Sequence, residues 1–173
     1  TFGDNLIAIA RAGAGVNNIP VDRCAQEGIC VFNTPGANAN AVKELAICAL
    51  LLASRKITEA AAWAASLKGT PDAPKTVEGG KSKFAGPEIK GKTLGIIGLG
   101  AIGGQIANAA EALGMKVIGY DPYLSIGAAL HLDPTTKVVS DINEIYKNSD
   151  YITIHMPYTP QTKNTIDAEQ IAM

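Results

Sequence analysis

Three glycines and one aspartate in the middle of the chain have the spacing needed to hold a dinucleotide. Gly98, Gly100 and Gly103 come directly after a short apolar run, and an alanine-rich segment with helical character follows them. A second apolar run ends at Asp121, eighteen residues after the last glycine. In such a strand–turn–helix–strand unit the glycines permit a tight turn, close approach of a pyrophosphate and close packing of the helix on the strand. The start of the helix offers unpaired N–H groups to the phosphates.

Asp121 indicates which dinucleotide the turn would take. A carboxylate at this position can accept hydrogen bonds from both ribose hydroxyls of NAD, and it would repel the 2′-phosphate of NADP. No Arg or Lys follows Asp121 directly. The residues therefore predict NAD as cofactor, bound by Gly98, Gly100, Gly103 and Asp121. Another nucleotide or an S-adenosyl ligand on the same turn is the alternative, because a glycine pattern alone is a weak signal in a chain with 18 glycines.

The chain offers few groups that could move a proton. His155 ends an apolar run, at the predicted sheet edge where ligands gather, but no carboxylate or nucleophile beside it in sequence would complete a catalytic couple. His131 lies in a predicted loop. For both histidines a role outside proton transfer is favoured, and no Ser, Cys or Asp has the spacing of a nucleophile elbow or a triad. The sequence thus predicts a cofactor site without a catalytic residue.

Strands and helices alternate along the chain, which predicts an α/β fold with a Rossmann-type, doubly wound parallel sheet. The expected strands are Leu6–Ala10 (a buried strand), Ile29–Phe32, Leu94–Ile97, Val117–Tyr120, Lys137–Val139 and Tyr151–His155. The expected helices are Val21–Glu27, Ala41–Leu67, Gln105–Leu113, a turn at Ser125–Leu130, Ile142–Lys147 and a last helix capped by Asp167.

Two stretches suggest further organisation of the chain. Gly13 and Gly15 lie close after the first strand, where a loop could bring backbone N–H groups to a ligand or could be an ordinary turn. The helix expected at Ala41–Leu67 contains no Gly or Pro and is apolar over much of its girth, which is typical of burial on more than one side. The polar stretch before it, residues 33–40 (NTPGANAN), is the best candidate for a domain boundary. After it, Gly69–Gly91 is a predicted linker with one short helix, Pro74–Glu78.

The composition is that of a globular chain with a core. Of 173 residues, 47% are hydrophobic and 18% charged, and the net charge of −1 favours neither nucleic acid nor an anionic membrane as partner. The longest apolar stretch, Leu45–Ala53, is too short to span a bilayer. Cys24, Cys30 and Cys48 lack metal-ligand spacing, so we expect no metal and buried free thiols in a reducing cytoplasm. Because the chain starts without Met, we expect the natural protein to be longer.

Beyond these motifs, the sequence resembles the D-isomer-specific 2-hydroxyacid dehydrogenase family over essentially its whole length. The resemblance is carried by residues 11–18 (RAGAGVNN), 24–29 (CAQEGI), 33–35 (NTP), the glycine turn, 119–122 (GYDP) and 155–157 (HMP). Within the family, residues 36–45 (GANANAVKEL) and 84–88 (FAGPE) are most similar to the phosphoglycerate branch.

The resemblance implies two domains. A smaller, flavodoxin-like substrate domain would be made from both chain ends, with the NAD-binding domain inserted between them. Residues 1–36 would be the C-terminal part of the first substrate-domain segment, and residues 37–173 the first part of a truncated NAD-binding domain. The long helix resembles the interdomain and dimer helix of the family, so a cytoplasmic homodimer is expected.

The resemblance also implies ligand roles. Backbone N–H groups of Gly13, Ala14 and Gly15 would bind the substrate carboxylate, Ala14 would also lie near the nicotinamide, and Asn38 matches an active-site asparagine. The positions that match cofactor contacts are Ala101 and Ile102 over the pyrophosphate, Asp121 at the ribose and Met156 beside the cofactor. The catalytic Arg, Glu and His of the family would lie after Met173. His155 matches a family histidine that is not the catalytic one.

The implied activity is NAD-dependent oxidation of the C2 hydroxyl of a D-2-hydroxyacid. The phosphoglycerate branch implies 3-phosphoglycerate as substrate and 3-phosphohydroxypyruvate as product, a step of serine biosynthesis. Another D-2-hydroxyacid, such as glycerate or lactate, is one alternative. An NAD-responsive binding protein similar to the corepressors of the family is the other. No metal, nucleic acid or membrane partner is expected.

Overall fold

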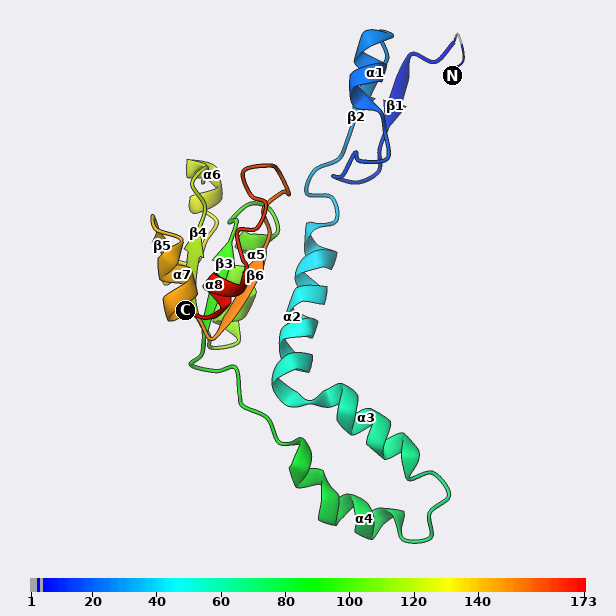
Figure 1. The fold of residues 1–173 in the computed structure, drawn as a ribbon, viewed down its shortest axis with the longest axis vertical. Coiled ribbons are helices and arrows are strands. Elements are labelled where there is room, and N and C mark those ends of the chain that lie inside the picture. Colours follow the sequence, from blue (N-terminus) through cyan, green and yellow to red (C-terminus); the bar gives the residue numbers. More distant parts are fainter. Residues whose placement is uncertain (1–2, 4) are drawn as a thin grey trace. The chain divides into compact units, whose positions relative to one another are not determined.

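The computed structural model describes residue 3 and residues 5–173, which divide into one unit of residues 1–42 and another of residues 43–173. The first unit contains β1 (Ala8–Ala10), α1 (Val21–Gln26) and β2 (Cys30–Phe32) (Figure 1). β1 and β2 pair in parallel, with Ala8 opposite Cys30. The strand predicted from residue 6 is therefore shorter than expected. It is also not buried, since Ile7 is 81% exposed.

The second unit is built on a parallel sheet with the strand order β5-β4-β3-β6. Its strands are β3 (Thr93–Ile97), β4 (Lys116–Tyr120), β5 (Lys137–Val139) and β6 (Tyr151–Ile154). The strands and the helices that follow them alternate as predicted. The Rossmann-type parallel sheet expected from the sequence is confirmed.

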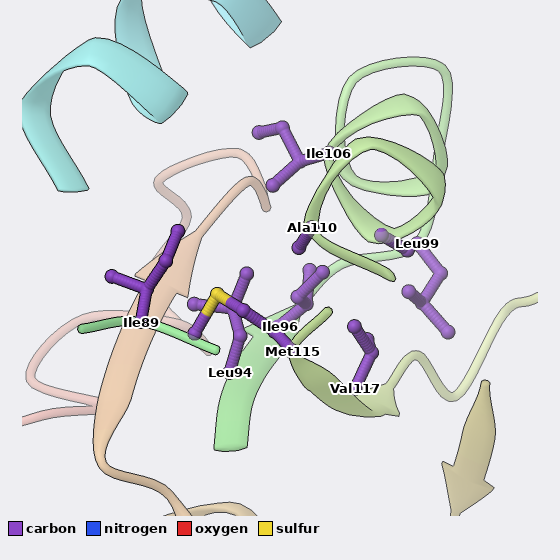
Figure 2. Packing of buried hydrophobic residues seen from close by; sticks show 9 residues of the cluster. Ile89, Leu94, Ile96, Leu99, Ile106, Ala110, Met115 and Val117 are labelled. Carbon is purple, nitrogen blue, oxygen red and sulfur yellow. The ribbon is translucent and has the colours of Figure 1, made fainter. Parts of the chain in front are cut away.

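Successive residues of a strand point to opposite faces of the sheet, so each face presents apolar side chains. Helices cover both faces and bury these side chains. Leu94 and Ile96 belong to the core on the side of α5 (Gly103–Ala112), whereas Ile97 packs in the core on the side of α7 (Asn143–Asn148). Figure 2 shows Ala110 of α5 directed toward Ile96 of the strand, with Ile106 in the same buried cluster. Burial of these side chains fixes α5 on β3 and β4, and with it the turn that precedes α5.

The prediction of one continuous helix over residues 41–67 is wrong in one respect, because the segment forms two helices. α2 (Ala39–Arg55) and α3 (Ile57–Ser66) are separated by Lys56, which has a left-handed backbone with φ of 49°. A tertiary contact fixes the end of α2. Ser54 Oγ bonds to Tyr151 Oη at 2.9 Å, and a side chain at Gly86 would collide with the Ser54 carbonyl group. No Gly or Pro in the sequence marks this break.

The predicted linker also contains more helix than expected. It forms α4 (Ala73–Gly80) and the 3-10 helix η1 (Lys81–Phe84), and the rings of Phe84 and Trp63 lie 5.0 Å apart. The short helices near the C-terminal end are α6 (Ile126–Ala129) and α8 (Ala168–Ile171), with Ser125 and Asp167 as side-chain caps. Within the described residues, no helix combines the length and the hydrophobicity needed to span a membrane.

The expectation of three buried thiols is wrong for two of them. Cys24 is buried, but Cys30 and Cys48 are exposed. Exposure alternates along β2, and Cys30 lies on the exposed side together with Phe32. On α2, Ile47 and Leu50 face the core beside the sheet, whereas Cys48 does not. The prediction failed because a cysteine is apolar enough to be buried but can also lie on the exposed side of a strand or helix, and its residue type does not indicate which side it takes.

Glu111 on α5 is a carboxyl group held in a partly buried position. Thr136 Oγ1 donates to Glu111 Oε1 at 2.9 Å, whereas Oε2 is buried and has no hydrogen-bond partner in the described part of the chain. Burial raises the pKa of this carboxyl, the bond from Thr136 opposes the shift, and the neighbouring Asp133 carboxylate adds to it. Folding is therefore penalised when Glu111 is ionised.

We expect Glu111→Gln to raise the free energy of unfolding at neutral pH by about 1 kcal/mol, because the amide keeps the acceptor for Thr136 and can donate to Asp133. Since the folded-state pKa is raised, the native protein gains stability as pH falls from neutral toward the ordinary value of 4.5. The advantage of the variant should shrink over the same range. Urea unfolding of both proteins at several pH values measures this, and an advantage that grows on acidification would contradict it.

Candidate functional site

The glycine turn at the end of β3 holds α5 unusually close to the strand. Gly98 has φ of +94°, a conformation that side-chain-bearing residues rarely adopt, and its N–H donates to Tyr120 O at 2.8 Å. A Cβ on Gly103 would collide with the carbonyl oxygen of Gly98. The turn therefore requires glycine at both positions, for reasons that lie within the protein itself.

Gly100 differs, because nothing lies within 4 Å of the place where its Cβ would be. The N–H groups of residues 100–103, which include Ala101 and Ile102, have no acceptor among the residues that the structure describes. These groups open the N-terminus of α5, where unpaired donors and the helix dipole favour an anion. The arrangement fits a pyrophosphate, with open space over Gly100 for its approach.

Asp121 lies beside this turn. Its Oδ2 accepts from Leu99 N–H at 2.9 Å and its Oδ1 accepts from Tyr123 N–H at 2.9 Å. The carboxylate is thus fixed next to Gly100, at the carboxyl end of β4, and each oxygen retains lone pairs for a further donor. Ribose hydroxyls are donors of that kind. The sequence did not reveal the bond to Leu99, because it joins residues 22 positions apart.

The residues after β6 complete this edge of the sheet. His155 N–H donates to Ile97 O at 2.7 Å, and its ring Nε2 lies 2.8 Å from Thr153 Oγ1. Burial lowers the pKa of His155, which favours the neutral ring. The backbone of His155 also packs against Gly98. These contacts agree with a structural role rather than with a general base.

Met156 is half-buried and packs against the core on the α7 side of the sheet. It also lines a cavity of about 320 Å³ beside β6. The other lining residues are Ile154, Pro157, Tyr158, Thr162, Asn164, Thr165 and Ile166. Any contact of Met156 with a cofactor would involve packing or the backbone, since its side chain offers no strong polar group.

The predicted substrate residues lie in the first unit. Gly13 N–H donates to Thr34 Oγ1 at 2.7 Å and to Arg11 O at 3.0 Å, so it is engaged within the protein. The N–H groups of Ala14 and Gly15 have no acceptor in the described residues. Asn38 is exposed just before α2, and its side-chain amide forms no hydrogen bond to another described residue.

Each unit therefore presents one set of open polar groups. The predicted cofactor residues of the second unit gather at the carboxyl edge of its sheet. In the first unit Gly13, Ala14 and Gly15 lie in the loop after β1, whereas Asn38 lies after β2, just before α2. Thr34 and Asn33 were missed as contributors to that loop. Their contacts reach back some twenty residues along the chain, a distance over which spacing carries no signal.

A comparison with protein families matches residues 47–173 to the D-isomer-specific 2-hydroxyacid dehydrogenase NAD-binding domain. This match confirms NAD as the predicted cofactor. The chain is 44% identical to D-3-phosphoglycerate dehydrogenase of Methanocaldococcus jannaschii, over 98% of the chain and 30% of that protein. It is 43% identical to hydroxypyruvate reductase of Thermotoga maritima, over 98% of the chain and 50% of that protein. The chain thus spans half or less of these relatives.

Solved structures agree with these matches. D-lactate dehydrogenase from Aquifex aeolicus, complexed with NAD and lactic acid, is similar with a TM-score of 0.74 and 28% identity, over 98% of this chain and 47% of that one. NAD-bound 3-phosphoglycerate dehydrogenase of Entamoeba histolytica has a TM-score of 0.69 and 34% identity, over 96% of this chain and 44% of that one.

The two glycines should respond differently to the same added methyl group. Gly100→Ala should leave the thermal midpoint nearly unchanged and weaken NAD binding by roughly tenfold or more, because the methyl occupies the approach to the pyrophosphate. Gly103→Ala should destabilise the protein by roughly 3 kcal/mol, because the methyl meets backbone that cannot move aside. Calorimetric titration and thermal unfolding separate the two effects. Equal NAD affinity in wild type and Gly100→Ala would contradict the assignment.

Proposed function

Because the chain belongs to the D-isomer-specific 2-hydroxyacid dehydrogenase family, we propose that the protein carrying it oxidises the C2 hydroxyl of a D-2-hydroxyacid to the 2-oxo acid. NAD, when bound, accepts the hydride from C2. The observation that supports this most strongly is the set of open N–H groups at residues 100–103 beside the fixed Asp121 carboxylate. The cofactor-binding residues proposed are Gly98, Gly100, Ala101, Ile102, Gly103, Asp121, Ala14 and Met156.

In this proposal the protein mainly binds and orients. The open N–H groups at the start of α5 hold the pyrophosphate, and Asp121 accepts from the ribose hydroxyls. The loop of the first unit binds the carboxylate of the substrate through backbone N–H groups, with Asn38 as a further polar contact. Gly13 would help to shape that loop and would not itself donate to the substrate, since its N–H is already bonded to Thr34 Oγ1.

The groups that move the proton are proposed to lie outside residues 1–173. An Arg would hold the carboxylate through paired hydrogen bonds, and a His oriented by a Glu would take the hydroxyl proton. In support, the ring Nε2 of His155 is engaged with Thr153 Oγ1. The boundary between substrate and NAD-binding segments, predicted after residue 36, stays a prediction.

For the substrate we propose 3-phosphoglycerate, which would place the reaction in serine biosynthesis in the cytoplasm. Support comes from the relatives, since proteins named D-3-phosphoglycerate dehydrogenase are 38–44% identical to this chain. Hydroxypyruvate reductase of Thermotoga maritima, at 43%, makes glycerate the second candidate. 3-Phosphoglycerate and glycerate share the C2 hydroxyl and the carboxylate, and the proposed loop would bind that carboxylate in either acid. The two acids differ only at the third carbon, which carries the phosphate in 3-phosphoglycerate.

We also propose that the protein forms a homodimer through α2 and α3. Leu45 on α2 is 70% exposed, and α3 is rich in alanine yet has no buried residue. Exposed apolar surface of this kind is typical of an interaction site. Sedimentation equilibrium of the native polypeptide tests this, and a monomer at micromolar concentration would contradict it.

The activity is tested with the native polypeptide that carries residues 1–173, supplied with NAD and either 3-phosphoglycerate, D-glycerate, D-lactate or formate. We expect NADH formation, with kcat/KM highest for 3-phosphoglycerate. The 173-residue chain alone should bind NAD and form no NADH, since the proposed proton-transfer groups are absent from it. NAD binding by the native polypeptide without oxidation of any acid would favour a cofactor-responsive binding protein.

Asp121→Asn tests the cofactor preference. The amide oxygen can still accept from Leu99 N–H, so the bond to the glycine turn is kept, whereas the bond from Tyr123 N–H is lost because the amide nitrogen only donates. Loss of the charged acceptor should weaken NAD binding by roughly 10- to 100-fold, while NADP binding improves relative to NAD because the repulsion of its 2′-phosphate is removed. Titration with each cofactor measures the ratio. An unchanged NAD to NADP ratio would show that Asp121 does not contact the ribose.

A further inference from the structure

Four consecutive carbonyl groups in the loop after β1 point toward donors within the first unit. Each of these oxygens accepts a hydrogen bond from Arg11, Asn33 or Thr34. The pairs are Arg11 Nη1 with Ala12 O (2.9 Å), Thr34 N with Gly13 O (3.0 Å), Asn33 Nδ2 with Ala14 O (2.9 Å) and Arg11 Nε with Gly15 O (3.2 Å). The loop is therefore fixed peptide by peptide, although it belongs to no helix or strand.

This fixation determines where the N–H groups point. In a trans peptide the C=O and the following N–H lie on opposite sides, and no cis peptide occurs in the described residues. With the carbonyl groups of residues 13–15 directed inward, the N–H groups of Ala14, Gly15 and Val16 are directed away from these partners. None of the three has an acceptor among the residues described. Successive unpaired N–H groups form a concave site suited to an anion.

We propose that Thr34 and Asn33 are positioning residues that turn the N–H groups of Ala14, Gly15 and Val16 toward the substrate carboxylate. The inference rests on the proposed function and deepens it in two ways. It replaces Gly13 by Val16 in the set of donors. It also assigns roles to two side chains that do not touch the substrate themselves.

Thr34 is the stronger of the two positioning residues because it holds Gly13 at two points. Its Oγ1 accepts from Gly13 N–H at 2.7 Å, and its own N–H donates to Gly13 O at 3.0 Å. Thr34 thereby fixes both the N–H and the carbonyl group of Gly13. Without the hydroxyl, Gly13 N–H loses its shorter bond, and the peptide that carries Ala14 N–H is held only through Gly13 O, which keeps the bond from Thr34 N–H.

Asn33 fixes the next peptide in the same manner. Its side-chain amide donates to Ala14 O at 2.9 Å, which directs Gly15 N–H outward. Aspartate has nearly the same shape but cannot donate. It would also place a negative charge beside a site for a carboxylate.

The test compares Thr34→Val, Thr34→Ser and Asn33→Asp in the native polypeptide, with 3-phosphoglycerate and NAD as substrates. Thr34→Val and Asn33→Asp should raise KM for the acid by roughly tenfold or more. KM for NAD should change less than KM for the acid, because Ala14 is the one residue of this loop among the proposed cofactor contacts. Thr34→Ser should restore the wild-type KM, because serine keeps the acceptor oxygen.

A matched control is Thr70→Val. Thr70 also loses a hydroxyl that bonds to backbone, its Oγ1 donating to Leu67 O at 2.7 Å in an exposed loop, but it has no part in the site. Its KM for the acid should equal that of wild type. An unchanged KM in Thr34→Val, with wild type active, would overturn the inference. If Thr34→Val fails to fold, Asn33→Leu, which removes the donor to Ala14 O without adding a charge, decides by the same criterion.

Amide NMR separates this inference from the proposed function. D-glycerate added to the wild-type protein should shift the signals of Ala14, Gly15 and Val16, and the shifts should be lost or reduced in Thr34→Val and Asn33→Asp. If the wild type oxidises no hydroxyacid, the proposed function fails, whereas these shifts still report on the loop. Equal shifts in wild type and both variants, or shifts at Gly13 without Ala14 to Val16, would overturn the inference.

Discussion

The start of α5 lies directly against the end of β3, and this contact is possible only because residues 98 and 103 lack side chains. A Cβ on Gly103 would meet the Gly98 carbonyl oxygen, and a Cβ on Gly98 would meet the backbone of His155. The close approach brings the N-terminus of α5 to the carboxyl edge of the sheet, where its unpaired N–H groups face outward. Burial of Ile96 and Ile106 in the core beneath α5 holds the arrangement (Figure 2).

Both units use the same device to leave backbone N–H groups open, in the described residues, for the anions of the proposed function. In the second unit, Asp121 accepts from Leu99 N–H and leaves the following N–H groups open. In the first unit, Thr34 and its neighbour Asn33 bind inward-facing groups of the loop and leave the next N–H groups open. Backbone donors lose no side-chain entropy when they bind a ligand, and they are fixed before it arrives. In the proposed function, discrimination between ligands then depends on a few side chains, with Asp121 foremost.

The elements with local signals were predictable from the sequence. The parallel sheet, the glycine turn and the cap at Asp167 depend on periodicity or spacing within a few residues. The break at Lys56 was not predictable, because it depends on Gly86 packing against the end of α2. The engagement of Gly13 N–H was missed for the same reason, since its partner Thr34 lies 21 residues away. Contacts between distant segments leave no trace in the pattern of one sequence.

The most direct test of the central claim is to follow the backbone amide signals of the second unit by NMR while NAD is added. We expect saturable shifts concentrated at residues 100–103, together with a shift at Leu99, whose N–H is bonded to the Asp121 carboxylate. Shifts confined to other parts of the chain, or no saturation at millimolar NAD, would contradict the claim that this turn is where the dinucleotide binds.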